Sequence, residues 1–276
     1  MAPRIRTMRP ADVEPAAAAI RLDDFGDRRA WFEFATSYAG CHPFVADLDD
    51  RIVGTGVGTR NGPVGWIGAI WVASDRRGHG IGRALTEAVI SALVDGGVRS
   101  LVLVASEDGR RLYERMGFEL QTWYDTFEAP GTPDVAPPSE VRPFRRADLE
   151  AMASLDRVAT GEDRAAILRR FARAGTARVV ERDGAVAGFV VRAPWGGAAT
   201  AAPEPEDALR LLAARRAAAP SDHLVRAAIP REHEAGRAAL LRSGFRPAWS
   251  APRLVRGQPV RWQPEQLWGQ FNMAMG

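Results

Sequence analysis

A glycine-rich turn is the segment of the sequence best suited to bind a ligand, because it lies between an apolar run and an amphipathic run. Its glycines are Gly78, Gly80 and Gly82, and its arginines are Arg76, Arg77 and Arg83. Glycine lets main-chain N–H groups approach an anion closely, and a following helix adds unpaired N–H groups and the positive end of its dipole. The turn is therefore suited to a phosphate or pyrophosphate, with guanidinium groups available to pair with it.

The turn does not match the two most familiar nucleotide motifs. A dinucleotide-binding fingerprint requires a final glycine or alanine, and here that position is Arg83 or Leu85, depending on where the motif starts. A Walker A motif requires lysine, whereas all 37 basic residues of this chain are arginine. The absence of lysine also excludes pyridoxal phosphate chemistry. What remains is the pattern R-x-x-G-x-G from Arg77 to Gly82, which an ordinary turn before a helix would also give.

A second block, about thirty residues further along, changes that interpretation. It reads Leu112-Tyr113-Glu114-Arg115-Met116-Gly117-Phe118 and follows Ser106. The turn and this block, in this order and spacing, resemble the GNAT superfamily of acyl-CoA-dependent N-acyltransferases over residues 1–130. The stretch from Gly109 to Phe118 further resembles tandem members of the family, which carry a degenerate second GNAT-like domain.

The resemblance implies a cofactor site, with acetyl-CoA as co-substrate, between two splayed parallel strands that end at Val72 and Ala105. Main-chain groups near the end of the first strand would hold the pantetheine arm and polarise the thioester, and the turn would bind the pyrophosphate. The implied cofactor-binding residues are Ile70, Trp71, Val72, Arg77, Gly78, His79, Gly80, Ile81, Gly82 and Arg83, with Ser106 as a further contact where many relatives have asparagine. Tyr113 stands where the family places the general acid that protonates the leaving thiolate. The alternative for Tyr113 is a packing role beside Leu112 and Met116.

The implied reaction is direct attack of a primary amine on the thioester, and its general base is not evident. Many relatives carry a glutamate on the strand before the turn, but residues 65–72 contain no acid. The candidates are water, a carboxylate (Asp23, Asp24, Glu33 or Asp125), or the Gly276 carboxylate if the tail folds back. We expect the acceptor to contact acids and aromatics, which suit a cationic amine: Asp24, Phe25, Trp31 and Trp123. Trp31 also fits a core stripe together with Phe34.

The chain contains a diverged internal repeat. A shift of 136 superposes residues 5–30 on 141–166 with ten identities, among them Arg6/Arg142 and Asp12/Asp148. A shift of 127 later superposes Gly117-Phe118 on Gly244-Phe245. Between the copies, residues 129–138 are rich in proline and glycine, as linkers are. We therefore predict a catalytic GNAT domain at 1–130, a linker at 131–140, and a degenerate GNAT-like domain without a CoA loop at 141–276.

Hydrophobic periodicity gives the elements that must position the site. The first copy predicts a strand at 4–8, a helix from residue 12, a helix at 28–38, and a hairpin at 44–49 and 51–59. It continues with a strand at 64–72, a helix at 80–95, a buried strand at 98–105, a short helix at 108–116, and a strand at 118–127 that closes the sheet. The fold class is α/β (α+β): two tandem domains, each a central mixed, mostly antiparallel sheet flanked by helices.

The second copy has lost the residues that would bind and process the cofactor. Tyr113 corresponds to Leu240, which cannot donate a proton, and the turn corresponds to residues 202–207, which contain three acids, two prolines and no glycine. Acids repel a phosphate and proline lacks an N–H donor. Ser106 corresponds to His233, which we expect at the surface. We predict that the second domain binds no CoA and supports the acceptor site.

Composition restricts the remaining classes of function. The formal net charge is +3 despite a pI near 9.7, and arginines are interspersed with acids, so nucleic-acid binding is disfavoured. One cysteine, Cys41, allows no internal disulfide and no cysteine-based zinc site, and no metal is expected. No segment resembles a signal peptide or a membrane helix, so we expect a soluble, cytoplasmic monomer or homodimer without a membrane partner. The alternative to an enzyme is a non-catalytic acyl-CoA sensor or regulatory module.

Overall fold

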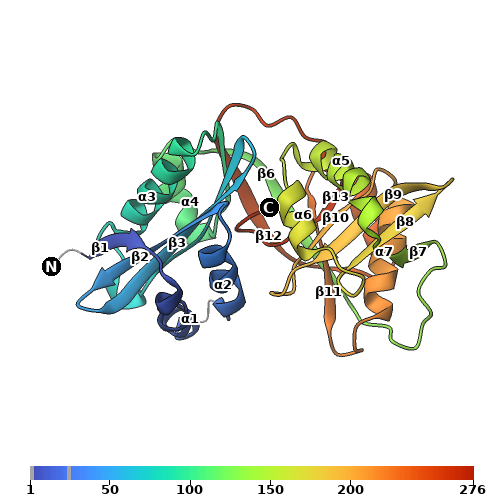
Figure 1. Cartoon of the computed structure of the whole chain (residues 1–276), viewed down its shortest axis with the longest axis horizontal. Coiled ribbons are helices and arrows are strands. Elements are labelled where there is room, and N and C mark those ends of the chain that lie inside the picture. Colours follow the sequence, from blue (N-terminus) through green and yellow to red (C-terminus); the bar gives the residue numbers. More distant parts are fainter. Residues whose placement is uncertain (1–2, 24–25) are drawn as a thin grey trace.

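The computed structural model describes residues 3–23 and 26–276, and the two halves of the chain lie side by side in it (Figure 1). The strand and helix order predicted for the first half is confirmed. Its elements are β1 (Arg4–Thr7), the 3-10 turn η1 (Pro10–Asp12), α1 (Val13–Arg21), α2 (Arg29–Ser37), β2 (Cys41–Leu48), β3 (Arg51–Asn61), β4 (Val64–Val72), η2 (Ser74–Arg76), α3 (Ile81–Asp95), β5 (Ser100–Val104), α4 (Glu107–Arg115) and β6 (Glu119–Pro130).

The second half repeats this order and adds a final strand. Its elements are β7 (Val141–Pro143), η3 (Arg146–Asp148), α5 (Leu149–Thr160), α6 (Ala165–Phe171), β8 (Ala177–Arg182), β9 (Ala185–Arg192), β10 (Ala198–Ala201), α7 (Pro205–Ala217), β11 (Leu224–Pro230), α8 (Glu234–Arg242), β12 (Arg246–Gly257), η4 (Pro264–Gln266) and β13 (Leu267–Gly269).

The repeat is visible in matched polar contacts as well as in element order. Arg6 contacts Asp12 through its Nη1 at 2.7 Å, and Arg142 contacts Asp148 in the same way at 2.8 Å. In both copies the aspartate also accepts a hydrogen bond from a main-chain N–H three residues earlier. These contacts fix the turn that follows the first strand of each half. The identities in the repeat are therefore structural, and they explain why the first turn is better conserved between the copies than the rest.

The sheets do not follow the division between the halves. The larger sheet has the strand order β1-β2-β3-β4-β5-β12-β6-β11, and the smaller one has the order β13-β10-β9-β8-β7. The prediction that residues 118–127 close the first sheet is wrong, because β12 lies between β5 and β6 and β11 pairs with the other side of β6. β6 and β12 are equivalent strands of the repeat, and main-chain hydrogen bonds do not distinguish them, so they have exchanged places. The exchange makes the two halves one hydrogen-bonded unit.

Helix α3 is held against the first sheet by an unusually close approach to β3. Gly54, Gly56 and Gly58 lie on one face of β3, and a Cβ at any of them would meet side chains of α3 at 2.8 to 3.6 Å. The α3 residues concerned include Leu85 and Leu93, both fully buried. Each such leucine stabilises the fold by roughly 1.5–3 kcal/mol. This packing fixes α3, and therefore the glycine-rich turn at its N-terminus, relative to the end of β4.

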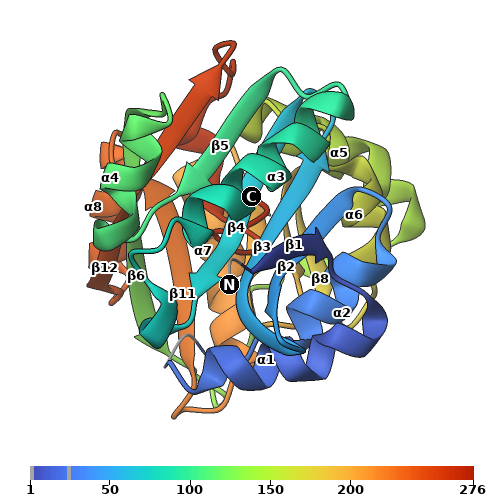
Figure 2. The same ribbon diagram turned by 90° about the vertical axis from the view of Figure 1, so that its left-hand side faces the viewer.

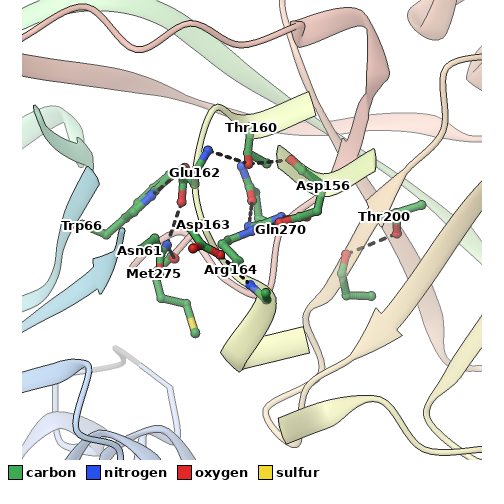
Figure 3. Close-up of polar contacts among 12 residues, drawn as sticks. Asn61, Trp66, Asp156, Thr160, Glu162, Asp163, Arg164, Thr200, Gln270 and Met275 are labelled. Carbon is green, nitrogen blue, oxygen red and sulfur yellow. Dashed lines mark hydrogen bonds and ion pairs between the residues drawn. The ribbon is translucent and has the colours of Figure 1, made fainter. Parts of the chain in front are cut away.

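A fully buried polar cluster joins the halves (Figure 3). Glu162, 1% exposed, accepts hydrogen bonds from Asn61 Nδ2 at 2.6 Å and from Trp66 Nε1 at 2.9 Å. Burial raises the pKa of Glu162, although the nearby arginines and these hydrogen bonds oppose the rise. Beside it, the Arg164 guanidinium contacts both oxygens of Asp156, at 2.9 and 2.5 Å. Removing one member of such a buried pair leaves the other charge buried without a partner, which typically lowers the free energy of unfolding by about 3–5 kcal/mol.

The C-terminal residues 271–276 fold back between the halves, where Figure 1 places the C-terminus. Asn61 Nδ2 donates to the Met275 carbonyl at 2.9 Å, and a Cβ at Gly68 would lie 2.4 Å from the Ala274 Cα. Gly68 is therefore glycine because the tail passes directly over it. Within the residues that the structure covers, no helix is both long and apolar enough to cross a membrane.

Candidate active site

The two parallel strands of the first half separate toward their C-terminal ends. β4 and β5 pair from Val64 opposite Ser100 to Ile67 opposite Leu103, and the pairing stops there although β4 runs on to Val72. In Figure 2, α3 and α4 lie on the face of the sheet turned toward the viewer, beside these strands. The gap between the strands therefore opens beneath the two helices that the sequence predicts to carry the site.

A bulge in β4 accompanies the separation. Thr55 and Val57 of β3 pair with Trp71 and Gly68, so β4 has one extra residue in this interval. Ala69 has φ of +51°, a conformation that residues with a Cβ rarely adopt, and its carbonyl accepts a hydrogen bond from Thr55 Oγ1 at 2.8 Å. Bulges of this kind redirect the main-chain groups that follow them. The bulge at Ala69 therefore changes the direction of residues 70–72, the segment that the family resemblance assigns to the thioester.

The glycine-rich turn has the geometry of an anion site. Gly78 and Gly80 have φ of +81° and +78°, and a Cβ at either would meet no atom within 4 Å, so conformation and not space requires glycine. The first intrahelical hydrogen bond of α3 runs from Ala84 N to Gly80 O. The N–H groups of Ile81, Gly82 and Arg83 thus have no intrahelical acceptor and stand at the positive end of the helix dipole.

The arginines of the turn are fixed to different degrees. Arg77 donates to the Val72 carbonyl at 3.1 Å and to Asp23 Oδ2 at 3.0 Å, and Asp23 also accepts from Trp71 Nε1 at 3.1 Å. Asp23 therefore ties the turn to the end of β4 and is committed to that role. Arg83 forms an exposed pair with Glu87 on its own helix at 2.8 Å. Such exposed pairs are weak, and a phosphate can displace them.

The turn, the strand ends and α4 enclose a cavity of about 500 Å³. Nine of the eleven predicted cofactor-binding residues line it: Ile70, Val72, Arg77, Gly78, Gly80, Ile81, Gly82, Arg83 and Ser106. Trp71 and His79 do not; the Trp71 ring is buried on the other side of the strand beside Asp23, and His79 Nδ1 lies 2.9 Å from the Arg77 carbonyl. Four further lining residues, Gly109, Leu112, Arg115 and Met116, were not assigned to the site from the sequence. Their helical spacing after Ser106 was the available signal, whereas Arg76, which also lines the cavity, was recognised as a possible phosphate partner.

Tyr113 also lines this cavity, and its ring is 8% exposed. The ring packs edge-on against Phe118, with centroids 6.1 Å apart. Burial raises the pKa of Tyr113 to about 12, so its hydroxyl is protonated across the physiological range. Tyr113 is therefore packed, as the alternative interpretation predicts, and it also lines the cavity that contains the glycine-rich turn.

Ser106 caps helix α4 from the cavity wall. Its Oγ accepts a hydrogen bond from Gly109 N at 3.2 Å, which leaves the hydroxyl proton for another acceptor. The equivalent residue of the second half, His233, performs the same cap, with Nδ1 accepting from Gly236 N at 3.2 Å. The expectation that His233 lies at the surface is wrong, since it is 3% exposed. Both helices have the cap, but it is exposed at Ser106 and buried at His233.

In the second half, the strand β13 occupies the space that corresponds to this cavity. β13 pairs with β10 and contacts β11, the strands equivalent to β4 and β5. Its Trp268 is fully buried, donates to the Ala202 carbonyl at 3.1 Å, and packs edge-on against His233 at 4.6 Å. Leu240, the counterpart of Tyr113, belongs to the same apolar cluster. The protein therefore fills this cleft with its own tryptophan.

Of the four residues predicted to contact the acceptor, the structure describes Trp31 and Trp123. Asp24 and Phe25 lie outside the described residues. Trp31 is 2% exposed and packs edge-on against Trp195 at 5.1 Å, as the core-stripe alternative predicts. Trp123 lies under the guanidinium of Arg231 at 4.9 Å, and neither tryptophan lines the cavity of Tyr113.

Of the remaining candidate bases, Asp125 and Gly276 have other contacts, the latter through its terminal oxygen, which accepts a hydrogen bond from Phe271 N at 3.0 Å. Burial alone would raise the pKa of Asp125, but hydrogen bonds from Arg231 and Ser250 lower it below its usual range, and Arg237 contacts the same carboxylate. Glu33 is exposed on α2. Among the described residues, no group of three or more histidine, cysteine or acidic side chains could hold a metal ion.

The comparisons with known proteins agree with this geometry. Residues 10–118 match the acetyltransferase (GNAT) family, and residues 152–269 match an acetyltransferase (GNAT) domain. The two matches cover the two halves of the repeat in turn. The chain belongs to the GNAT acetyltransferase family, and its two domains are in tandem.

Solved structures show the same fold across nearly the whole chain. A putative acetyltransferase from Pyrococcus horikoshii superposes with a TM-score of 0.83 at 22% identity, covering 99% of this chain and 95% of the other. A GCN5-related N-acetyltransferase from Sphaerobacter thermophilus gives 0.64 at 15% identity, covering 95% and 98%. A tandem GNAT protein from the clavulanic acid biosynthesis pathway gives 0.60 at 16% identity, covering 92% and 98%. A search of curated proteins returned no match.

Proposed function

We propose that the protein transfers an acetyl group from acetyl-CoA to a primary amine by direct attack, with Tyr113 as general acid. The observation that carries the proposal is one cavity lined both by the glycine-rich turn and by Tyr113. Its residues fit an acyl-CoA: the unpaired N–H groups of α3 and the arginines suit the pyrophosphate, and the gap between β4 and β5 suits an extended arm. Family membership supports acyl transfer in general, and this geometry supports the finer assignment.

Each group then has a stated part in the proposed reaction. Main-chain groups of residues 70–72, redirected by the bulge at Ala69, would hold the arm and donate to the thioester oxygen as it gains charge, an effect that typically contributes a large share of catalysis. The amine attacks the carbonyl carbon, the carbon–sulfur bond breaks, and the Tyr113 hydroxyl gives its proton to the departing sulfur. No enzyme nucleophile is needed. The amine loses its proton to water, since Asp23 and Asp125 are held by arginines.

The second half has a supporting role in this proposal. We assign residues 1–130 as the catalytic domain, 131–140 as the linker, and 141–276 as the degenerate domain that binds no CoA, because Trp268 fills its cleft. Its strand β12 completes the catalytic sheet beside β5. A structural support of this kind explains why the second copy persists without the phosphate-binding turn.

A non-catalytic acyl-CoA sensor is the second candidate, and the absence of an acid on β4 favours it. The two are separated by measuring acetyl-CoA thiol release over a panel of primary amines, with acetyl-CoA affinity measured by calorimetry in parallel. We expect amine-dependent release and one acetyl-CoA per chain. Tight acetyl-CoA binding without release for any amine would support the sensor and contradict the acetyltransferase. Absence of acetyl-CoA binding would contradict both.

A further inference from the structure

Two adjoining cavities open on the second half, away from the cavity of Tyr113. The smaller has a volume of about 140 Å³ and lies between β8, β9 and the end of α7. The larger has a volume of about 590 Å³ and extends to β6, β11, β12, the start of α2 and the C-terminal residues 269–273. Gly196, Arg215 and His223 line both. We refer to the two together as the Arg215 pocket.

The Arg215 pocket concentrates positive charge. Arg178, Arg192 and Arg215 line its smaller part, and none of them forms an ion pair with a carboxylate of the described chain. Within residues 3–23 and 26–276, no aspartate or glutamate lines either cavity. This is unusual for the molecule, because many of its other arginines are paired with acids on the same or a neighbouring element. A site with several cations and no described acid in its walls attracts anions.

The topology makes these guanidiniums converge. Arg178 of β8 lies opposite Val190 of β9, and Arg192 is two residues beyond Val190, so all three are on one face of the sheet. Helix α7 places Arg215 against that face, where its Nη1 donates to the Arg226 carbonyl at 2.7 Å. Burial and the nearby Arg192 lower the pKa of Arg215 to about 10. The helix dipole explains why an arginine such as Arg215 lies near the C-terminus of α7. It does not explain why Arg178 of β8 and Arg192 of β9 lie beside it.

The larger part of the pocket connects this charge with the catalytic sheet. Thr126 of β6, 2% exposed, lines it, and its hydroxyl has no hydrogen-bond partner. Asn272 and Met273 form another part of its wall, and the next residue, Ala274, packs against Gly68. Gly68 immediately precedes the bulge of β4, and it faces away from α3 because Ile67 packs toward that helix. The pocket therefore extends from the arginines to the C-terminal segment, and that segment lies on the side of β4 opposite α3.

We propose that the Arg215 pocket binds the anionic group of the acceptor, so that the acceptor is an amine that also carries a carboxylate or a phosphate. The proposal rests on the acetyltransferase function given above and makes it specific. It replaces the cationic acceptor expected from acids and aromatics in the first half. Trp195, Trp249 and Met273 line the larger part and suit an apolar connecting segment. The unpartnered Thr126 hydroxyl supplies one polar contact along that path.

The first test compares matched amines. Thiol release is measured with ethanolamine against O-phosphoethanolamine, and with propylamine against β-alanine, at saturating acetyl-CoA. We expect the anionic member of each pair to have a kcat/KM at least tenfold higher. Arg192→Gln and Arg215→Gln remove that preference by raising KM for the anionic amine roughly tenfold or more, because each loses a charge-assisted contact. Arg242→Gln, an exposed arginine on α8, is the charge-matched control and retains the preference. Equal kcat/KM values within both pairs would overturn the proposal.

A binding measurement separates this proposal from the proposed function. The protein is first saturated with CoA, which covers the turn at Arg77–Gly82, and inorganic phosphate is then titrated by calorimetry. We expect binding to the wild type and to Arg242→Gln, and at least tenfold weaker binding to Arg192→Gln. Phosphate binding that is the same in all three would overturn the pocket. If acetyl-CoA binds but no amine is acetylated, the acetyltransferase function fails, and the acceptor assignment fails with it even if phosphate binds at Arg192.

Discussion

Replacing Tyr113 with phenylalanine removes one oxygen from the wall of the acyl-CoA cavity and leaves the packing of the ring in place. The ring keeps its edge-on contact with Phe118, at 6.1 Å between centroids, and no hydrogen bond of the described structure is lost with the hydroxyl. We therefore expect the free energy of unfolding to change by less than about 1 kcal/mol, since neither a cavity nor an unpaired polar group is created. The glycine-rich turn is unaltered, so we expect acetyl-CoA affinity to be retained.

The effect on catalysis follows from where the proton goes. A phenol and a thiol ordinarily differ by about 1.5 pKa units, about 2 kcal/mol. Burial of Tyr113 widens this difference, so the proposed proton transfer must accompany the breaking of the carbon–sulfur bond. General acids typically contribute about 100- to 10,000-fold, so kcat of Tyr113→Phe is expected to fall at least 100-fold.

The assay is thiol release at saturating acetyl-CoA and amine, with calorimetry for acetyl-CoA and thermal unfolding as controls. Because the pKa of Tyr113 is about 12, kcat/KM of the wild type is expected to show no loss from Tyr113 ionisation between pH 7 and about 10. Turnover within threefold of wild type for a folded, acetyl-CoA-binding Tyr113→Phe protein would refute the general-acid assignment. Unfolding of the variant would refute the packing argument instead.

Three further results are expected, each from a separate feature. Gly80→Ala should weaken acetyl-CoA binding about tenfold, because a left-handed conformation costs a residue with a Cβ roughly 1–2 kcal/mol; Gly175→Ala, in open space, is the calorimetric control. Trp268→Ala should lower the free energy of unfolding by about 3–5 kcal/mol in urea titrations, because it leaves a cavity in the second half. The wild type should bind one acetyl-CoA per chain; binding of two would be incompatible with a second cleft filled by Trp268. Burial lowers the pKa of His233 to about 4, so between pH 6.5 and 4 the unfolded chain binds a proton that the folded chain does not. Stability should therefore fall as the pH falls through this range, by up to about 3 kcal/mol, and His233→Gln should fall less steeply; parallel pH profiles would contradict it.

Local patterns in the sequence were enough to predict most elements and one wall of the site. Apolar periodicity gave the helices and strands of the first half, and the spacing of Gly78 and Gly80 indicated a turn that requires positive φ. The repeat predicted two related domains, and the substitution of Tyr113 by Leu240 predicted which copy is degenerate. All of these depend on residues close together in the chain, where main-chain conformation and helix termini are decided by the residues themselves.

The tertiary structure decided what depends on contacts distant in sequence. Strand β12 lies beside β5 because equivalent strands of a repeat pair equally well, and no local pattern distinguishes them. Glu162 contacts Asn61 and Trp66, which are about a hundred residues away in sequence. Trp268 fills the second cleft from a C-terminal segment in which no sequence motif indicated that role. The arginines of the Arg215 pocket are ordinary in sequence and become a cluster only when β8, β9 and α7 meet. Electrostatic attraction depends on distance in space, which the sequence does not contain.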